Sequence, residues 1–211
     1  MRWCLPMLNR RLIILGFGGH ARSVADVALA CGYGSLLFVD ENAKPNENFL
    51  GHPVVGSLPA LEGESCDAIS ASGDNAKRAK QCQDIEASGL KLISLISPLA
   101  SMGCGSVIAE GSFIAHHSHV GPMASIGRGA IINTGAIVEH ESVVGDFSHV
   151  SVKSVIAGRS TIGSFSMLGA GAVIIDGLLV GNHSVIGAGA VVCNAITEPG
   201  VYVGVPARKL K

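Results

Sequence analysis

The chain has 211 residues, of which 48% are hydrophobic, 15% charged and 4% aromatic, and its formal net charge is −1. This balance gives no electrostatic basis for binding nucleic acid or an anionic membrane surface. No stretch approaches the roughly 18 apolar residues of a membrane span, and the six cysteines form no CxxC pair or Cys/His cluster. We therefore expect a soluble cytoplasmic protein with reduced thiols and no metal.

The first half of the chain, residues 12–97, alternates strand and helix signals. Short branched-apolar runs such as "RLIILG" and "SLLFVD" are typical of strands, and "HARSVADVALACG" and "NAKRAKQCQDIEASG" have helical spacing. This alternation predicts a small parallel sheet with helices on its faces. "SPLAS" breaks the pattern at Pro98, so we expect a first domain over 1–97 and a second over 98–211.

The segment "GFGGHAR" follows the first expected strand and precedes a helix. Its backbone N–H groups and the helix N-terminus suit phosphates. Gly16, Gly18 and Ala21 fit the dinucleotide fingerprint, and Asp40 ends the second expected strand, where an acid binds a ribose hydroxyl. "ASGDN" (71–75) adds a glycine turn at the same sheet edge. This half is short for a dinucleotide fold, so a nucleotide sugar fits better; tight turns without a ligand are the alternative.

From residue 108 an aliphatic side chain recurs at every sixth position, fifteen times without a slip, ending at Val192. All but Leu168 are β-branched, and the residue four places later is small in thirteen of the fifteen cases. A period of six matches neither a strand nor a helix but indicates a β-helix of stacked coils. The aliphatic residues are expected to point inward and the small residues to lie at tight corners.

This repeat resembles the left-handed β-helix of hexapeptide-repeat acyltransferases. The resemblance implies a three-sided coil made of three hexads, so that the fifteen hexads make five coils. The expected fold is thus a small α/β Rossmann-like domain for a nucleotide sugar, followed by a left-handed parallel β-helix with a C-terminal tail.

The segment "IVEHESVVGDFSHVS" (137–151) concentrates polar residues in an otherwise apolar repeat. With three hexads in a coil, His140 stacks between Pro122 and Gly158 and projects outward near a corner. A histidine flanked by carboxylates can act as a general base, with Glu141 fixing its tautomer. Gly158 would leave room and a backbone N–H for an acyl group and an oxyanion. A surface histidine on a solvated coil is the alternative.

The segment "AHHSHVG" raises the possibility of zinc, because γ-type carbonic anhydrases use the same helix with zinc-binding histidines. However, His116 and His117 point to different sides of a strand, and no HxxxxH spacing occurs. We expect no metal site here.

Both halves together resemble one family of bacterial sugar acetyltransferases. It includes the UDP-4-amino-sugar N-acetyltransferase of bacillosamine synthesis, the perosamine N-acetyltransferases and the sialic acid O-acetyltransferases. The resemblance covers nearly the whole chain after about residue 11 and rests on "GGHAR", "VDE", "SGDN", "INTGAIVEHESVVGDFSHVS", "GAGAVV" and "GVYVGVPAR".

The resemblance implies that His140 is the catalytic base and that Glu141 raises its basicity. It also implies that His149 contacts acetyl-CoA, together with backbone groups of Ala170 and Ala188. Asn133 matches a residue at the wall of the active site. The implied UDP-sugar pocket consists of Gly18, Gly19, His20, Asp40, Glu41 and Gly73.

The activity implied is N-acetylation by acetyl-CoA of the 4-amino group of a UDP-linked 4-amino-4,6-dideoxy sugar, in a homotrimer with sites between adjacent β-helices. Transfer would be direct, because no Cys or Ser lies where an acyl-enzyme needs its nucleophile. Three alternatives stay open. The first is another acceptor, either a GDP- or dTDP-amino sugar or a sialic acid hydroxyl. The second is a different enzyme, a zinc carbonic anhydrase. The third is a β-helix scaffold that binds the nucleotide sugar without turnover.

Overall fold

The computed structural model describes residues 10–58 and 66–210, and residues 1–9 of the expected first domain therefore lie outside the description. The chain divides into two compact units, Met1–Pro98 and Leu99–Lys211. Within the described residues, neither helix combines the length and the apolar character that crossing a membrane requires.

The first unit is an α/β unit built on a six-stranded sheet with the order β3-β4-β2-β1-β5-β6. The strands pair in parallel except for β3 and β4, an antiparallel pair that the sequence pattern did not predict. The elements are β1 (Arg11–Leu15), α1 (Gly19–Ala30), β2 (Ser35–Val39), β3 (Asn48–Phe49), β4 (His52–Val55), β5 (Asp67–Ser70), α2 (Asn75–Ala87), β6 (Lys91–Leu92) and β7 (Leu95–Ile96). The small parallel sheet expected from the alternating pattern is confirmed.

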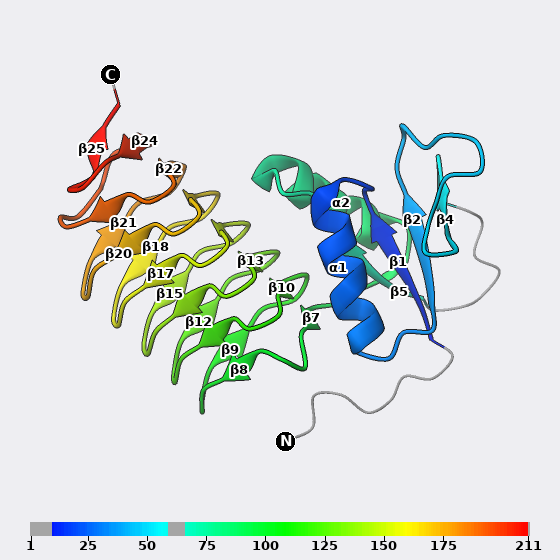
Figure 1. Ribbon diagram of the computed structural model, residues 1–211, viewed down its shortest axis with the longest axis horizontal. Helices are drawn as coiled ribbons and strands as arrows, with labels where there is room; N and C mark the ends of the chain where they lie inside the picture. The colour runs from blue at the N-terminus through cyan, green and yellow to red at the C-terminus, as the bar shows by residue number, and fades with distance from the viewer. Residues whose placement is uncertain (1–9, 59–65, 211) are drawn as a thin grey trace. The chain divides into compact units, whose positions relative to one another are not determined.

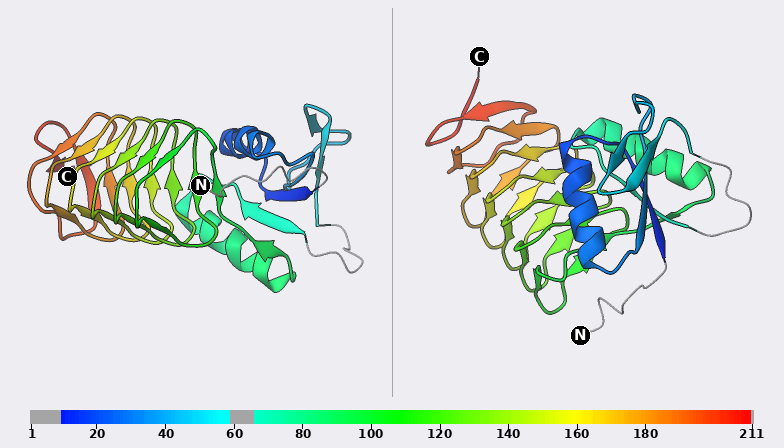
Figure 2. Two further views of the ribbon diagram at one scale, coloured as in Figure 1. Left: turned by 90° about the horizontal axis from the view of Figure 1, so that it is seen from below. Right: turned by 45° about the vertical axis from the view of Figure 1, so that its right-hand side comes forward.

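The strand order reverses beside β1. The chain leaves β1 through α1 to reach β2 on one side, and it leaves β5 through α2 to reach β6 on the other. Because such crossovers are right-handed, the two helices cover opposite faces of the sheet, as Figure 2 shows. Ligands of open α/β sheets bind at the carboxyl ends of the strands next to such a reversal, which here carry the loops 16–18, 40–43 and 71–74.

The central strands β1 and β2 each carry a continuous run of four apolar residues, because both faces of the sheet are covered there. Leu12, Ile13 and Ile14 of β1 and Phe38 of β2 have no exposed surface. Helix α1 buries its alanine and valine face, which includes Val24, and leaves its polar residues outside.

The second unit is a parallel β-helix whose coils stack in one direction (Figure 1). Strands on the same side of successive coils pair in parallel with a step of three hexads, as Ile131 does with His149. The fold expected from the six-residue period is confirmed. One sheet contains β10 (Phe113–Ile114), β13 (Ile131–Ile132), β16 (His149–Val150), β19 (Met167–Leu168), β22 (Ser184–Ile186), β24 (Gly200–Val203) and the antiparallel β25 (Arg208–Lys209).

The other two sides of the coil form two further sheets. The second sheet contains β8 (Ser101–Met102), β11 (His119–Val120), β14 (Ile137–Val138), β17 (Val155–Ile156), β20 (Val173–Ile174) and β23 (Val191–Val192). The third contains β9 (Val107–Ile108), β12 (Ser125–Ile126), β15 (Val143–Val144), β18 (Thr161–Ile162) and β21 (Leu179–Val180).

The recurring aliphatic residues fill the inside of the coil. Fourteen of the fifteen are at most 1% exposed, and Ile108, in the first coil, is half-buried. Burial of one such side chain contributes about 1.5–3 kcal/mol, so this interior column is the main source of stability in the unit.

The small residues at the corners fit the tight turns, and the buried serines among them also form hydrogen bonds between successive coils. Ser166 Oγ donates to the carbonyl of Gly181 at 3.0 Å and accepts the backbone N–H of Ser184 at 3.0 Å. Ser148 and Ser160 make equivalent pairs of bonds. These hydroxyls satisfy backbone groups that the tight corners would otherwise leave unpaired.

Candidate active site

Two corners of the β-helix carry the candidate catalytic residues. The first, which we call the histidine edge, joins the second sheet to the third and carries His140, Glu141, Gly158 and Asp176. The second, which we call the alanine edge, joins the first sheet to the second and carries Asn133, Thr134, Ala170 and Ala188. Residues one full coil apart lie above one another on each edge.

His140 and Glu141 form a pair on the histidine edge. His140 Nδ1 lies 3.2 Å from Glu141 Oε2, and the His140 side chain is 43% exposed. A carboxylate only accepts hydrogen bonds, so the contact places the imidazole proton on Nδ1 and leaves the lone pair on Nε2. The predicted histidine–carboxylate pair is therefore present, with Nε2 available as a base.

The Nε2 atom of His140 faces the space above Gly158. A Cβ added to this glycine would lie 2.5 Å from His140 Nε2 and 3.0 Å from Asp176 Oδ1. The missing side chain thus makes room for the imidazole. The space that we expected to receive an acyl group is partly filled by the base itself.

Asp176 and Arg159 complete the histidine edge, and the sequence pattern did not reveal either of them. Arg159 Nη2 lies 2.6 Å from Asp176 Oδ2. This hydrogen bond with Asp176 raises the pKa of the Arg159 guanidinium above its ordinary value. Asp176 lies six hexads after His140. The only signal in the sequence that could have placed it beside His140 is the spacing of His140, Gly158 and Asp176, which are one coil apart from each other in turn.

On the alanine edge, Asn133 lies against His149. Asn133 Nδ2 is 3.1 Å from His149 Nε2, and Asn133 Oδ1 accepts the backbone N–H of Thr134 at 2.8 Å. The His149 side chain is buried. Ala170 and Ala188 stack above one another on this edge, and both residues are exposed.

The structure does not bring all the predicted residues of this unit together in one chain. The strand β14 and its neighbours in the second sheet lie between the histidine edge and the alanine edge. His140, Glu141 and Gly158 therefore lie on one edge, while Asn133, Ala170 and Ala188 lie on the other, next to His149. Within the described ranges, no group of three or more His, Cys, Asp or Glu side chains is arranged to hold a metal ion.

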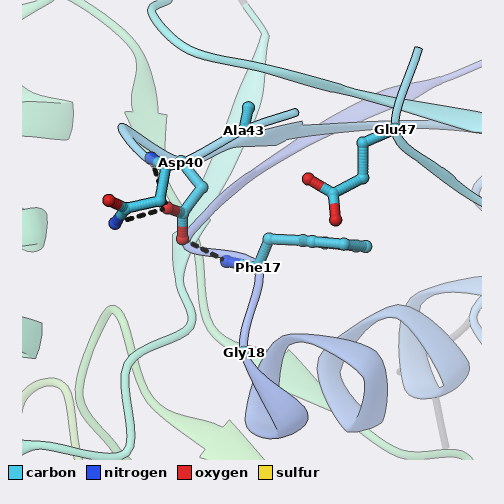
Figure 3. A pocket seen from close by; sticks show the side chains of 6 residues that line it. Phe17, Gly18, Asp40, Ala43 and Glu47 are labelled. Atoms are coloured by element: carbon cyan, nitrogen blue, oxygen red, sulfur yellow. Dashed lines mark hydrogen bonds between the residues drawn. The ribbon is translucent and has the colours of Figure 1, made fainter. Parts of the chain in front are cut away.

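In the first unit, the predicted nucleotide-sugar residues surround the carboxyl end of β1. A cavity of about 270 Å³ is lined by Phe17, Gly18, Asp40, Asn42, Ala43 and Glu47 (Figure 3). The Asp40 carboxylate accepts the backbone N–H of Phe17 at 2.8 Å and that of Asn42 at 2.9 Å. Burial alone would raise the pKa of Asp40, but these two backbone hydrogen bonds, the side-chain hydrogen bond of Asn42 and the charge of Lys77 together lower the pKa below its ordinary value.

A second cavity of about 330 Å³ lies between the ends of β1 and β2 and helix α2. Asp40 and Glu41 contribute carboxylates to it, and Lys77 and Lys80 of α2 contribute ammonium groups. Lys77 Nζ lies 4.0 Å from Glu41 Oε1. Asp84 also lines the cavity and forms an ion pair with Lys80, so the lining combines three carboxylates with two ammonium groups.

The predicted glycines of this unit lie in a loop or at the start of a helix: Gly18 precedes α1, Gly19 begins it, and Gly73 lies in the loop before α2. A Cβ added to Gly18, Gly19 or Gly73 would meet no atom within 4 Å, so these turns leave free space. His20, in the first turn of α1, is half-buried.

Arg78, which the sequence pattern did not reveal, is 1% exposed and supports the loop that contains Gly73. Its Nη1 donates to the carbonyl of Ser72 at 3.1 Å, and its Nη2 donates to Asn75 Oδ1 at 2.8 Å. The Gly73 loop is therefore fixed from inside the unit.

Comparison with known proteins gives the same fold over nearly the whole chain. Residues 11–85 match the family model of the PglD N-terminal domain. The acetyltransferase domain of PglB from Neisseria gonorrhoeae FA1090 is 33% identical, with a TM-score of 0.90, and the match covers 96% of this chain and 100% of that one. The same domain has also been solved in complex with acetyl coenzyme A.

A GDP-perosamine N-acetyl transferase from Caulobacter crescentus, in complex with CoA and GDP-perosamine, is similar to the same extent. It is 32% identical, with a TM-score of 0.88, and the match covers 96% of this chain and 98% of that one. WeeI from Acinetobacter baumannii AYE, at 21% identity and a TM-score of 0.67, shares the fold.

Proposed function

Because the chain belongs to the family of β-helix sugar N-acetyltransferases, we propose that it acetylates the 4-amino group of a UDP-linked 4-amino-4,6-dideoxy sugar with acetyl-CoA. The observation that carries this proposal is the contact of His140 Nδ1 with Glu141, which leaves Nε2 as a base facing the space above Gly158. The similarity to structures solved with acetyl coenzyme A and with CoA and GDP-perosamine supports it.

The chemical step is direct transfer. The neutral amine of the sugar attacks the carbonyl carbon of the thioester, and His140 Nε2 takes one proton from the nitrogen as the C–N bond forms. The C–S bond breaks, and the departing CoA thiolate takes the proton from His140, which returns to its neutral form. Glu141 holds the imidazole in the required tautomer and stabilises the imidazolium that forms.

The two substrates use different parts of the chain in this proposal. Gly18, Gly19, His20, Asp40, Glu41 and Gly73 contact the nucleotide sugar in the first unit. His149, Gly158, Ala170 and Ala188 contact acetyl-CoA in the second, with Asn133 at the wall of the site.

We also propose a homotrimer. His140 and His149 lie near different edges of one β-helix, so a site that uses both is completed where the histidine edge of one copy meets the alanine edge of the next. Both substrates are then held in one place, which supplies the proximity that direct transfer needs.

A second candidate acceptor is a GDP-linked amino sugar of the perosamine type. The 32% identity to the Caulobacter crescentus enzyme solved with GDP-perosamine favours it. Asp40 and Glu41 accept hydrogen bonds from the ribose of any nucleotide, so the acceptor has to be identified by its turnover.

The test is release of CoA thiol from acetyl-CoA with a panel of UDP-, dTDP- and GDP-linked 4-amino sugars and sialic acid. We expect turnover with the UDP-linked amino sugar, and a loss of about 10²–10⁴-fold in kcat in His140→Ala with little change in substrate affinity. Turnover with another acceptor alone contradicts the proposed substrate. Full activity of His140→Ala contradicts the proposed base.

A further inference from the structure

The side chain of Asp176 points at the reactive side of the proposed base. His140, Gly158 and Asp176 occupy one column of the histidine edge, at steps of one coil. The two polar side chains extend from the coils on either side toward the space above the glycine, where a Cβ would lie 2.5 Å from His140 Nε2 and 3.0 Å from Asp176 Oδ1. An acceptor that reaches Nε2 therefore also reaches the Asp176 carboxylate.

The upper limit on the separation of His140 Nε2 and Asp176 Oδ1 is compatible with a single nitrogen that bridges them. The separation cannot exceed the sum of their distances to the added Cβ, which are 2.5 Å and 3.0 Å. Among the described residues, no direct hydrogen bond or ion pair joins His140 to Asp176, whose ion pair is with Arg159. One nitrogen that hydrogen-bonds to both atoms needs a gap of roughly 4.5–5 Å, which this limit allows.

The Asp176 carboxylate is held in place with one oxygen left over. Its Oδ2 contacts Arg159 Nη2 at 2.6 Å, while its Oδ1 is the oxygen nearest to the space above Gly158. Arg159 thus orients the carboxylate without occupying Oδ1. Glu141 contacts Nδ1, on the other side of the imidazole, and Glu139 Oε2 accepts the backbone N–H of His140 at 3.4 Å. The carboxylate that lies beside the space above Gly158 is therefore that of Asp176.

We propose that Asp176 is a specificity-determining substrate contact, which accepts a hydrogen bond from the acceptor amino group and binds it as the ammonium ion. This inference rests on the proposed function. An ammonium ion gains a charge-assisted hydrogen bond from a carboxylate, which is about twice as strong as a neutral one. A sugar hydroxyl can donate a hydrogen bond to the same carboxylate but lacks the Coulomb attraction of the ammonium ion, so this contact favours an amine over a hydroxyl at the same position.

The contact also defines the path of the protons. The ammonium group releases one proton to solvent to give the neutral amine, and the second proton goes to His140 Nε2 as the nitrogen attacks the thioester. Asp176 keeps the nitrogen beside Nε2 through both steps and remains ionised.

The decisive experiment compares Asp176→Asn with wild type in two measurements. The first is the steady-state kinetics with the amino sugar that wild type turns over. The second is inhibition of that reaction by the matching nucleotide sugar with a hydroxyl in place of the amine. We expect KM for the amino sugar to rise about tenfold or more, because the charged hydrogen bond is lost. The inhibition constant of the hydroxyl compound should rise by a smaller factor, because only a hydrogen bond from a neutral donor is weakened, and the KM for acetyl-CoA should stay within about twofold.

Asp146→Asn is the matched control. Asp146 is also a β-helix aspartate at an edge, its Oδ1 accepts the backbone N–H of Arg128 at 2.8 Å, and Asn182 makes the equivalent bond to Ser164 in the same column. Asparagine is thus tolerated in that position, and the control should leave all three constants unchanged.

Three results would overturn the inference. An unchanged KM for the amino sugar shows that Asp176 makes no contact with it. A parallel rise for the amino sugar and the hydroxyl compound shows a structural role. A fall in kcat alone assigns Asp176 to the chemical step rather than to binding. If the wild-type protein acetylates none of the acceptors, the proposed function itself is wrong, and this result is distinguishable from the three results above because it needs no variant.

Discussion

Asn133 donates the hydrogen bond that joins it to His149, and the direction of this bond is determined by a third residue. The backbone N–H of Thr134 occupies Asn133 Oδ1 at 2.8 Å, so the amide NH₂ faces His149 Nε2 at 3.1 Å. His149 Nε2 is then the acceptor, which places the imidazole proton on Nδ1. The residue expected at the wall of the active site and the residue expected to contact acetyl-CoA thus form one hydrogen-bonded unit.

Asn133→Ala tests this unit. The variant removes the donor to His149, so we expect the KM for acetyl-CoA to rise about tenfold, equivalent to the loss of one hydrogen bond of about 1.4 kcal/mol, while the KM for the sugar changes less. Initial rates at varied acetyl-CoA provide the measurement. A rise confined to the sugar KM would place Asn133 in the sugar pocket alone.

Mixing two inactive variants tests the proposed trimer. His140→Ala removes the base from the histidine edge, and His149→Ala removes the contact beside the alanine edge. In mixed trimers some sites receive an intact edge from each chain, so we expect activity to reappear when the two proteins are unfolded and refolded together. Mixing without subunit exchange is the control, and no recovery in proven mixed trimers would place the whole site within one chain.

Glu141→Gln tests the orientation of the base. Glutamine keeps the size of the side chain but loses the charge that stabilises the imidazolium, so kcat should fall about tenfold to a hundredfold, less than the 10²–10⁴-fold expected for loss of the base. Glu139→Gln is the control, because Glu139 Oε2 accepts the backbone N–H of His140 at 3.4 Å rather than contacting the imidazole. Equal losses of kcat in the two variants would show that Glu141 has no particular role in orienting the imidazole.

Gly158→Ala tests the geometry above the glycine. The added methyl would lie 2.5 Å from His140 Nε2, so the imidazole has to move and kcat should fall by about a hundredfold or more. Gly181→Ala is the matched control in the same β-helix, since its nearest contact would be 3.2 Å, to a backbone oxygen. Circular dichroism of both variants should remain that of wild type; unchanged kcat in Gly158→Ala would show that the ring is free to move.

Asp40 makes the first unit sensitive to acid. Its pKa is lowered from the ordinary value of 3.8 in the folded chain, so its carboxylate contributes stability above that pH. The contribution is lost as the pH falls from 3.8 through the folded pKa. Denaturant unfolding should therefore show a difference between wild type and Asp40→Asn that is constant near neutral pH and shrinks in this acid window. A difference that grows in acid would mean that folding does not lower the pKa of Asp40.

The sequence pattern predicted most of the β-helix because its signal is repeated. Each inward aliphatic side chain occupies the same place in every hexad, and a slip of a single position would turn it to solvent. The pair of His140 and Glu141 was also predictable, since the two residues are adjacent in the chain. The fold of the first unit followed from strands and helices long enough to show their periods.

Other features depended on contacts that no local pattern records. Asp176 reaches His140 across two coils, and Arg78 supports the Gly73 loop from a helix that otherwise looks polar on its surface. The corner serines were expected to fit by size, whereas their hydroxyls also bond neighbouring coils. The short strands β3 and β4 carry too few residues to show an alternation.

The three-hexad step of the coil also constrains how this protein can change its length over evolution. Inserting or deleting one hexad between His140 and Asp176 would shift every later residue to the next side of the triangle, and the acid would leave the histidine's column. A change of a full coil would leave the sides aligned but put a new residue between them. We therefore expect length variation among homologues to be concentrated before His140 or after Asp176, and the segment between them to keep a constant length.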